Sequence, residues 1–590
     1  MTGDETREES GGGDPRANGE TAGADDVALD PWGSSSVSDY RKLFEEFGIE
    51  EFDALLEEVP TPHYLMRRGV IFGHRDYRPV AEAMANDDPF AALSGFMPTG
   101  DPHIGHKLVF DEIIWHQQQG GDAYALIADL EAHAARGMTW AEIDEHARDY
   151  LLSLLALGFD PEEGTLYRQS ANRELQDLAF ELGAEANFSE FQAIYGFDGE
   201  TDVSHMQSVV TQMADILYPQ VVDEPKPTVI PVGADQDPHV RLARDLAERM
   251  RYFGVTEAFA SFETESDAES QLLEWAYSNL EESAHSQGLE SEAIRCDLAA
   301  ELLSKYRSRQ AELQEKVPHG AEAHGSPEGS DGLFIKDAFR DDDNNLRLPD
   351  PSAESVFDDL FAVETFPPEG ISTKTFDSLV TKLRNSGKEP LQIRRRFLNR
   401  NATEEAFSAL IEAIPGKKRV YENHIDAFGM HYQEAKELAR EIELDHGGYG
   451  FLPPSSIYHR FMTGLTGGKM SSSEPASHIS LLDDPDEGYD KVKAATTGGR
   501  ETAAKQRELG GKADECPVYE LYAYLLSGDD DEFAKRVYDE CVGGERLCGD
   551  CKEQAAQLMR EFLAEHQEKR EEVEDLLENT DIELESSRRR

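Results

Sequence analysis

Two glycine-rich turns, far apart in the sequence, carry side chains suited to phosphate chemistry. The first turn, residues 94–106, reads SGFMPTGDPHIGH and contains His103 and His106 just before a helical pattern. The second turn, residues 467–473, reads GGKMSSS and supplies Lys469 and a run of serines. A turn that enters a helix presents free backbone N–H groups and the positive end of the helix dipole, which favours bound phosphate. We therefore expect both turns to serve a phosphate-containing ligand.

The order and setting of these turns resemble the HIGH and KMSKS signatures of class I aminoacyl-tRNA synthetases. Such enzymes form an aminoacyl adenylate by in-line attack on the α-phosphate of ATP, which is a substrate together with Mg2+. The reaction needs positioned cations and hydrogen-bond donors and no covalent catalyst. The resemblance assigns catalysis to His103, His106, Lys469, Ser471 and Ser473. It assigns ATP binding to these residues and to Thr99, Gly100, Gly105, Gly233, Asp235, Met470 and Ser472.

A third motif, Gly233-Ala234-Asp235-Gln236, follows the apolar stretch 228–232. A carboxylate and an amide at the end of a strand can hold ribose hydroxyls and an α-amino group. Taken alone, Asp-Gln after a buried strand is often only a helix cap. At this position the motif resembles the ribose and amino-acid loop of the tryptophanyl and tyrosyl branch of class I. The resemblance therefore narrows the substrate to tryptophan or tyrosine.

Several short segments favour tryptophan, because they resemble the tryptophanyl-tRNA synthetases of archaea and eukaryotes. They are Arg68-Gly69, FGHRD at 72–76, GGR at 498–500, LGG at 509–511 and AEHQ at 564–567. Tyrosyl enzymes and eukaryotic tryptophanyl enzymes carry a tyrosine where this chain has Leu93, which weakens the tyrosine alternative. In the second turn Ser472 replaces the second lysine of the family's motif, so this loop carries less positive charge.

The resemblance implies an amino-acid site formed by Leu93, Glu131, Gln212, Asp215 and Gln236. Glu131 falls where the archaeal and eukaryotic tryptophanyl branch places a glutamate at the indole N–H. Asp215 falls where bacterial tryptophanyl enzymes place their indole-reading aspartate, although tyrosyl relatives also have an aspartate there. A carboxylate that accepts a buried N–H contributes roughly 1.5–3 kcal/mol and penalises a substrate that cannot donate. Gln212 is a further contact or, alternatively, an amide on a helix surface.

The resemblance therefore implies a tryptophan–tRNA ligase, which activates L-tryptophan with ATP and transfers it to the 3′ end of tRNA(Trp). Relatives in this branch are homodimers, so we expect a homodimer. One alternative is a tyrosyl-tRNA synthetase. Another alternative is a non-charging paralogue that binds RNA as a regulator. The large insertion is consistent with this alternative, whereas catalysis is favoured by the intact residues His103, His106, Lys469 and Asp235.

Four of the five cysteines of the chain fall in one stretch near the C-terminus: Cys516, Cys541, Cys548 and Cys551. A Cys-x2-Cys pair with two further thiols nearby has the spacing of metal ligands. The arrangement resembles the cluster-binding cysteines of some bacterial tryptophanyl-tRNA synthetases. It therefore indicates a [4Fe–4S] cluster or a zinc ion. The alternative is that these are small buried residues, as free cysteines often are.

The composition indicates a folded protein from a very salty cytoplasm. The chain has 590 residues, 57 Lys and Arg against 119 Asp and Glu, and a net charge of −62. A hydrophobic content of 39% with clear periodicity argues against global disorder. At molar salt the Debye length is about 3 Å, so the negative charge excludes neither folding nor an RNA partner. We therefore expect a halophilic source, and the resemblance to the archaeal branch implies a halophilic archaeon. The polar start, the few cysteines and the lack of a long apolar run predict a cytoplasmic protein with no membrane contact.

Strand and helix patterns alternate through the first half of the chain, which predicts an α/β fold with a Rossmann-type catalytic domain. Strands are expected at 90–93, 123–127 and 228–232, and helices at 107–115, 140–157, 206–217 and 240–250. The predicted divisions are a disordered acidic tail (1–37), an N-terminal helical segment (38–62), the catalytic domain (63–253 and 447–483), a large, mainly helical insertion (254–446) and a helical anticodon-binding domain (484–590).

The insertion contains a basic stretch in an otherwise acidic chain. Its cationic residues are Lys382, Arg384, Lys388, Arg394, Arg395, Arg396, Arg400, Lys417, Lys418 and Arg419. A local positive patch is a candidate contact for the tRNA backbone. The alternative is a basic face that pairs with the acidic surface around it.

Overall fold

The structure is a computed structural model that describes residue 44 and residues 48–259, 393–416, 418–428, 430, 432–468, 470, 474–580 and 582. The predicted tail, most of the predicted insertion, Lys469 and residues 471–473 lie outside these residues.

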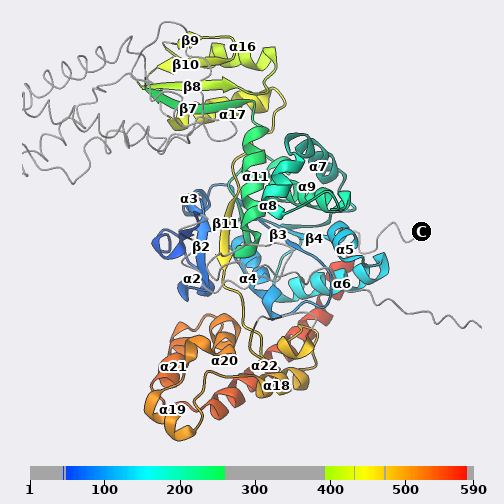
Figure 1. Ribbon diagram of the computed structural model, residues 1–590, viewed down its shortest axis with the longest axis vertical. Helices are drawn as coiled ribbons and strands as arrows, with labels where there is room; N and C mark the ends of the chain where they lie inside the picture. Colours follow the sequence, from blue (N-terminus) through cyan, green and yellow to red (C-terminus); the bar gives the residue numbers. More distant parts are fainter. Residues whose placement is uncertain are drawn as a thin grey trace, which may run out of the picture.

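Strands from distant parts of the chain form one seven-stranded sheet (Figure 1). In spatial order they are β1 Glu50–Glu51, β2 Ile71–Arg75, β11 Ser455–His459, β6 Thr228–Gly233, β3 Ala91–Phe96, β4 Asp122–Ile127 and β5 Gly164–Arg168. The strands from β11 to β5 run parallel, whereas β2 is antiparallel to β11 and β1 is antiparallel to β2. Parallel strands end at a common edge, where such sheets bind ligands. The predicted Rossmann-type α/β fold is confirmed.

Both faces of this sheet are buried, which explains why its strands read as apolar runs. In β4, Ala123, Ala125 and Ile127 join one hydrophobic cluster, and Tyr124 and Leu126 join another. Helices α4 Ile104–Gln118 and α6 Trp140–Leu157 contribute to the first cluster, and α7 Arg173–Glu185, α9 Val203–Leu217 and α11 Asp237–Arg249 to the second. Shorter elements are η1 Phe52–Ala54, α2 Tyr64–Arg67, α3 Arg78–Asn86, α5 Asp129–Arg136, α8 Phe188–Tyr195, α10 Pro219–Val222 and η2 Ala234–Gln236.

Part of the N-terminal segment expected to be helical is extended instead. Residues 50–51 form strand β1 on β2, and only the single turn η1 follows. Phe52 is fully buried and contacts the rings of His74 and Tyr77. Phe52 of this segment therefore packs against the edge of the sheet.

A second, antiparallel sheet follows α11 (Figure 1, top). Its strands, in the order β7-β8-β10-β9, are β7 Phe253–Phe259, β8 Ile393–Asn399, β10 His424–Phe428 and β9 Lys418–Val420. Helices α16 Glu404–Ala413 and α17 Tyr432–Asp445 share its hydrophobic core. The prediction of a mainly helical segment is therefore wrong for residues 393–428. Consecutive arginines conceal the alternation of β8, in which Arg395 and Phe397 are buried.

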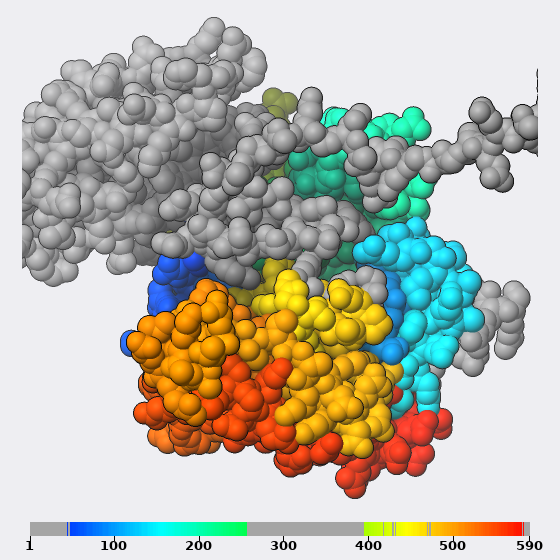
Figure 2. Space-filling view, turned by 60° about the horizontal axis from the view of Figure 1, so that its bottom comes forward, coloured from blue at the N-terminus to red at the C-terminus, as the bar shows by residue number. Residues whose placement is uncertain are grey.

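The C-terminal part is helical, as the sequence predicts. Its helices are α18 Pro485–Ala494, α19 Ala503–Leu509, α20 Pro517–Leu521, the π-helical turn η5 Tyr522–Leu526, α21 Asp531–Val542, α22 Cys548–Glu572 and α23 Glu574–Glu578, with 3-10 turns η3 Pro475–Ser477 and η4 Ala513–Glu515. Figure 2 shows these helices, orange to red, directly beside the cyan α6. Arg570 of α22 bonds Asp149 and Ser153 of α6. None of the helices in the described part of the chain is long and apolar enough to cross a membrane.

Candidate active site

The first glycine-rich turn joins β3 to α4 and is closed by its two histidines. His103 is the N-cap of α4: its Nδ1 accepts the N–H of Gly105 at 3.1 Å, and its own N–H donates to Nδ1 of His106 at 3.1 Å. The segment after the second turn lies against it, because the N–H of Ile104 donates to the carbonyl of Ile479. Reciprocal capping by the two histidines therefore fixes the start of α4.

Burial decides the protonation state of both histidines. It lowers the pKa of His106 to about 4 and the pKa of His103 well below its ordinary value, and the nearby His478 lowers both further. Each Nδ1 accepts a backbone N–H, so the single hydrogen of each neutral ring must lie on Nε2. The Nε2 of His106 lies 3.1 Å from the hydroxyl of Tyr150. Near pH 7 both rings are therefore neutral Nε2–H donors.

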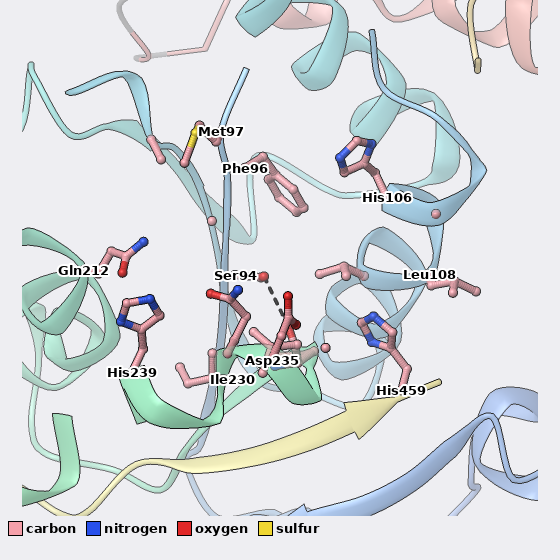
Figure 3. A pocket seen from close by; sticks show the side chains of 18 of the residues that line it. Ser94, Phe96, Met97, His106, Leu108, Gln212, Ile230, Asp235, His239 and His459 are labelled. Atoms are coloured by element: carbon pink, nitrogen blue, oxygen red, sulfur yellow. Dashed lines mark hydrogen bonds between the residues drawn. The ribbon is translucent and has the colours of Figure 1, made fainter. Parts of the chain in front are cut away.

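A cavity of about 500 Å³ opens at the carboxyl ends of β3, β4, β6 and β11 (Figure 3). Gln212 and His239 face it from the side opposite to His106 and His459. Of the residues implied by the sequence, it is lined by Leu93, Thr99, His103, Gly105, His106, Glu131, Gln212, Asp215, Gly233, Asp235, Gln236 and Met470. Gly100 lies outside the lining, and Lys469, Ser471, Ser472 and Ser473 lie outside the described residues.

Close packing explains two of the glycines in the cavity wall. A methyl group on Gly105 would lie 2.9 Å from Cε1 of His103, and one on Gly233 would lie 2.6 Å from Oδ1 of Asp235 and 2.8 Å from Cε1 of Phe461. Contacts this short force a neighbouring side chain to move. Gly233 therefore leaves room for the Asp235 carboxylate at the end of β6.

Glu131 and Asp215 meet in one buried hydrogen-bonded group. The amide of Gln169 donates to Oε1 of Glu131 at 2.7 Å and to Oδ2 of Asp215 at 2.6 Å. Gln212 donates to Glu131, and the hydroxyl of Tyr167 donates to Asp215. Gln212 therefore lines the cavity and is not a surface amide. Burial raises the pKa of Glu131 to about 7 and the pKa of Asp215 well above its ordinary value.

A fully buried arginine holds this wall of the cavity in place. Arg168, at the end of β5, donates to Asp129 at 3.0 Å and to Asp144 at 2.8 Å. Asp129 begins α5, and Asp144 belongs to α6. Asp129 also accepts hydrogen bonds from the backbone and hydroxyl of Ser170. Three elements around Glu131 are therefore joined through one guanidinium group.

Sequence reasoning missed several polar residues of the site. Tyr150, Tyr167 and Gln169 carry no motif, although Tyr167 and Gln169 flank the end of a short strand. The buried pair of His459 and Glu112, 3.2 Å apart, was also missed. Burial works to lower the pKa of His459, but Glu112 outweighs it and raises the pKa, while burial raises the pKa of Glu112. The one available signal for His459 was its place at the end of a strand.

The four C-terminal cysteines gather around a glycine-rich corner. A methyl group on Gly499 would lie 2.5 Å from Sγ of Cys548, and one on Gly511 would lie 2.6 Å from Sγ of Cys541. Burial raises the pKa of Cys551 to about 11, and Cys516 and Cys541 raise it further. Among the described residues, no three thiol sulfurs lie within 4.8 Å of one another. Tetrahedral zinc with Zn–S bonds of about 2.3 Å needs sulfurs about 3.8 Å apart, which no three of the described thiols satisfy together.

The basic stretch in 393–419 is largely engaged within the second sheet. Arg396 pairs with Asp426 at 2.8 Å, and Arg400 pairs with Glu248. Lys418 donates to carbonyls at the end of α16, and Arg395 is 1% exposed. These contacts favour the alternative of internal pairing over a tRNA contact for these residues. Lys382, Arg384, Lys388 and Lys417 lie outside the described residues.

Comparisons with known proteins agree with this geometry. A family model described as tRNA synthetases class I (W and Y) matches residues 85–265 and 430–564. The chain is 63% identical over 570 residues to the tryptophan–tRNA ligase 1 of Halobacterium salinarum, covering 96% of this chain and 98% of the relative. It is 41% identical over 552 residues to the tryptophan–tRNA ligase of Methanosarcina acetivorans, covering 92% and 96%.

The fold also resembles that of a solved structure, the tryptophanyl-tRNA synthetase of Aeropyrum pernix. The TM-score is 0.56 at 27% identity, and the match covers 94% of this chain and 99% of that chain. Similarity in sequence and in fold therefore extends along nearly the whole chain and includes every element that lines the cavity.

Proposed function

We propose that this chain, which belongs to the class I tRNA synthetases of the tryptophan and tyrosine type, ligates L-tryptophan to tRNA(Trp). It activates tryptophan with ATP to tryptophanyl-adenylate and then transfers the aminoacyl group to the 3′ end of the tRNA. The observation that carries this conclusion is the 63% identity to a tryptophan–tRNA ligase over nearly the whole chain. Neither alternative, a tyrosyl enzyme or a non-charging paralogue, has support from the comparisons.

The histidine turn is proposed to serve the phosphates of ATP. The Nε2–H groups of His103 and His106 suit donation to phosphate oxygens that gain charge in the transition state. Asp235 is proposed to bind the ribose. Gly105 is proposed to allow the nucleotide to approach the backbone closely. Lys469, Ser471, Ser472 and Ser473 are proposed, from the motif alone, to follow the departing pyrophosphate. Mg2+ enters with ATP as part of the substrate.

Tryptophan is proposed to occupy the wall formed by Leu93, Glu131, Gln212, Asp215 and Gln236. Leu93, Leu126 and Ile216 offer apolar surface for an indole ring, and the two carboxyl groups offer acceptors for its N–H and for the α-ammonium group. A buried acceptor selects for substrates that can donate to it, because an unmatched polar group stays desolvated.

ATP–pyrophosphate exchange tests this function directly. The full chain in molar KCl is assayed with tryptophan and with tyrosine separately. We expect exchange with tryptophan alone. Exchange with tyrosine would overturn the substrate assignment, and folded protein without exchange for either amino acid would leave RNA binding as the leading function.

Replacing Gly233 by alanine is expected to raise KM for ATP about tenfold, equivalent to about 1.4 kcal/mol, with a smaller effect on kcat. The added methyl group would displace the Asp235 carboxylate that we propose holds the ribose. The measurement is exchange at varied ATP. Gly199 is a matched control, since a methyl group there meets nothing within 4 Å. An unchanged KM in the Gly233 variant would contradict this role of Asp235.

The cysteine group is proposed to hold a [4Fe–4S] cluster, with zinc as the less well fitting choice. Cys516, Cys541, Cys548 and Cys551 would be the ligands, and Gly499 and Gly511 leave space beside two of the sulfurs. Metal analysis of anaerobically purified protein is expected to find about four irons per chain and an absorption band that bleaches on reduction. The C548S variant is expected to lose both. Protein free of iron and zinc would remove this proposal.

The enzyme is proposed to be a homodimer formed through the helices α7 to α9. Phe180 of α7 is 86% exposed and Val203 of α9 is 69% exposed, which is unusual for large apolar side chains. Phe180→Glu is expected to shift the mass in light scattering from two chains to one. Phe180→Tyr is the control. If the protein without substitutions has the mass of one chain in light scattering, the dimer proposal is wrong.

We also propose a function for each part of the chain. The catalytic domain would comprise 63–253 and 447–483, and the helical part, 484–590, would bind the anticodon. The segment 254–446 would be an insertion between the catalytic parts. Because tRNA is the second substrate, we propose that the enzyme acts in the cytoplasm.

A further inference from the structure

Three buried polar side chains in the cavity wall form one hydrogen-bonded unit. Glu131, Asp215 and Gln169 are 2%, 4% and 0% exposed. Gln169 donates to one oxygen of each carboxyl group at 2.7 and 2.6 Å. Gln212 donates to the other oxygen of Glu131 at 2.5 Å, and Tyr167 donates to the other oxygen of Asp215 at 2.9 Å. All four carboxyl oxygens therefore accept a hydrogen bond, and every donor is neutral.

The charges around the two carboxyl groups decide how readily these groups ionise. Within the ranges that the structure describes, neither forms an ion pair, and the adjacent Arg168 is engaged by Asp129 and Asp144. Asp129 raises the pKa of both carboxyl groups, and Arg136 of α5, Asp235 of η2 and His239 of α11 line the same cavity. Burial lowers the pKa of His239 to about 3, so His239 is neutral and adds no charge.

Two buried like charges resist simultaneous ionisation. Burial raises the pKa of Glu131 to about 7, which the hydrogen bonds from Gln169 and Gln212 partly oppose. Burial and then the charge of Glu131 raise the pKa of Asp215 well above its ordinary value. The pair is therefore partly protonated near neutral pH.

We propose that Gln169 is a positioning residue that couples Glu131 and Asp215, and that bound tryptophan expels a proton from this pair. This inference rests on the proposed function. Tryptophan brings an ammonium group, and a cation within about 4–6 Å lowers a carboxyl pKa by about 1–3 units. The proton passes to the solvent, and no covalent bond of the substrate changes.

Titration calorimetry of the full chain tests the proton release. L-tryptophan is titrated at pH 7 in molar KCl in two buffers of different ionisation enthalpy. We expect release of between about 0.5 and 1 proton per bound tryptophan, because a group with a pKa near 7 is about half protonated there. Indole-3-propionate, which lacks the ammonium group, is expected to release none. Tryptophan binding without proton release would overturn the inference alone, whereas absence of binding would overturn the proposed function as well.

The variant Gln169→Met tests the positioning role. Loss of the two amide donors raises the pKa of the pair. KM for tryptophan is expected to increase as the pH is lowered, and in the variant this increase should begin about one pH unit higher than in the unchanged protein. We expect about a tenfold higher KM at pH 7 and less than a threefold change in kcat.

Gln220→Met is the matched control. Gln220 is 2% exposed and bonds the backbone of Leu452, away from the cavity lining. This variant is expected to lose stability and to keep the pH profile of KM. An unchanged pH profile in folded Gln169→Met would overturn the positioning role.

Discussion

Replacing His106 by alanine is expected to lower kcat of tryptophan activation by about 10²–10³, with KM for ATP changed less than about threefold. The N–H of His103 fixes Nδ1 of His106, so its Nε2–H is oriented before the substrate binds. Removing one preorganised donor to a developing anionic charge typically costs about 2.7–4 kcal/mol in the transition state. The measurement is the rate of ATP–pyrophosphate exchange at saturating tryptophan.

Three comparisons separate this catalytic role from a structural one. His106→Asn keeps an N–H donor and is expected to recover part of the rate. His446→Ala removes a histidine that directly follows α17 and whose ring bonds the carbonyl of Ile442, and it should leave the rate unchanged. Because burial lowers the pKa of His106 to about 4, kcat should show no inflection from this group between pH 6 and 8. A His106→Ala enzyme that keeps more than a tenth of the rate would contradict the assignment.

Replacing Arg168 by methionine is expected to reduce the local free energy of unfolding by about 3–5 kcal/mol, because Asp129 and Asp144 would stay buried without their cation. The side chains of Asp129 and Asp144 are at most 5% exposed, so water cannot replace the guanidinium group as their partner. The loss should concentrate in β5 and the start of α5, which Arg168 and Asp129 join. Hydrogen exchange of the backbone amides in these elements measures it.

A surface arginine provides the matched control. Arg173, with 90% of its side chain exposed, faces Asp177, and Arg173→Met is expected to change the exchange free energies by less than about 1 kcal/mol. Adding Asp129→Asn to Arg168→Met should restore part of the stability by removing one of the stranded charges. Exchange rates in β5 and α5 equal to those of the unchanged protein would show that the buried ion pairs contribute little.

Three strands of the main sheet, β3, β4 and β6, were predictable because their signals are local. The apolar run of β4 and the helical period of α6, 140–157, follow from neighbouring residues, and both faces of the sheet demand apolar side chains. The residues of the two turns and of the Asp-Gln motif could be found for the same reason. Their types and spacing are unusual in themselves, and they line the cavity because parallel strands end at one edge.

The remaining parts of the site depend on contacts across long sequence distances. Gln169 has no motif, and its importance follows only from its place between Glu131 and Asp215, which come from α5 and α9. Strand β8 was mistaken for helix because its arginines are buried or paired across the sheet, as with Arg396 and Asp426. A buried ion pair looks in sequence like an exposed charge, so patterning alone misassigns it.

The place of β11 in the main sheet sets the timing of folding during synthesis. β11 pairs with β2 on one side and β6 on the other, yet the ribosome makes it roughly 220 residues after β6. At about 5–20 residues per second, β6 therefore emerges on the order of 10–45 s before its neighbour, with one edge unpaired. The antiparallel sheet β7–β10 is completed within this interval. The nascent chain consequently passes through a state with an incomplete main sheet, in which the high net negative charge opposes association between chains.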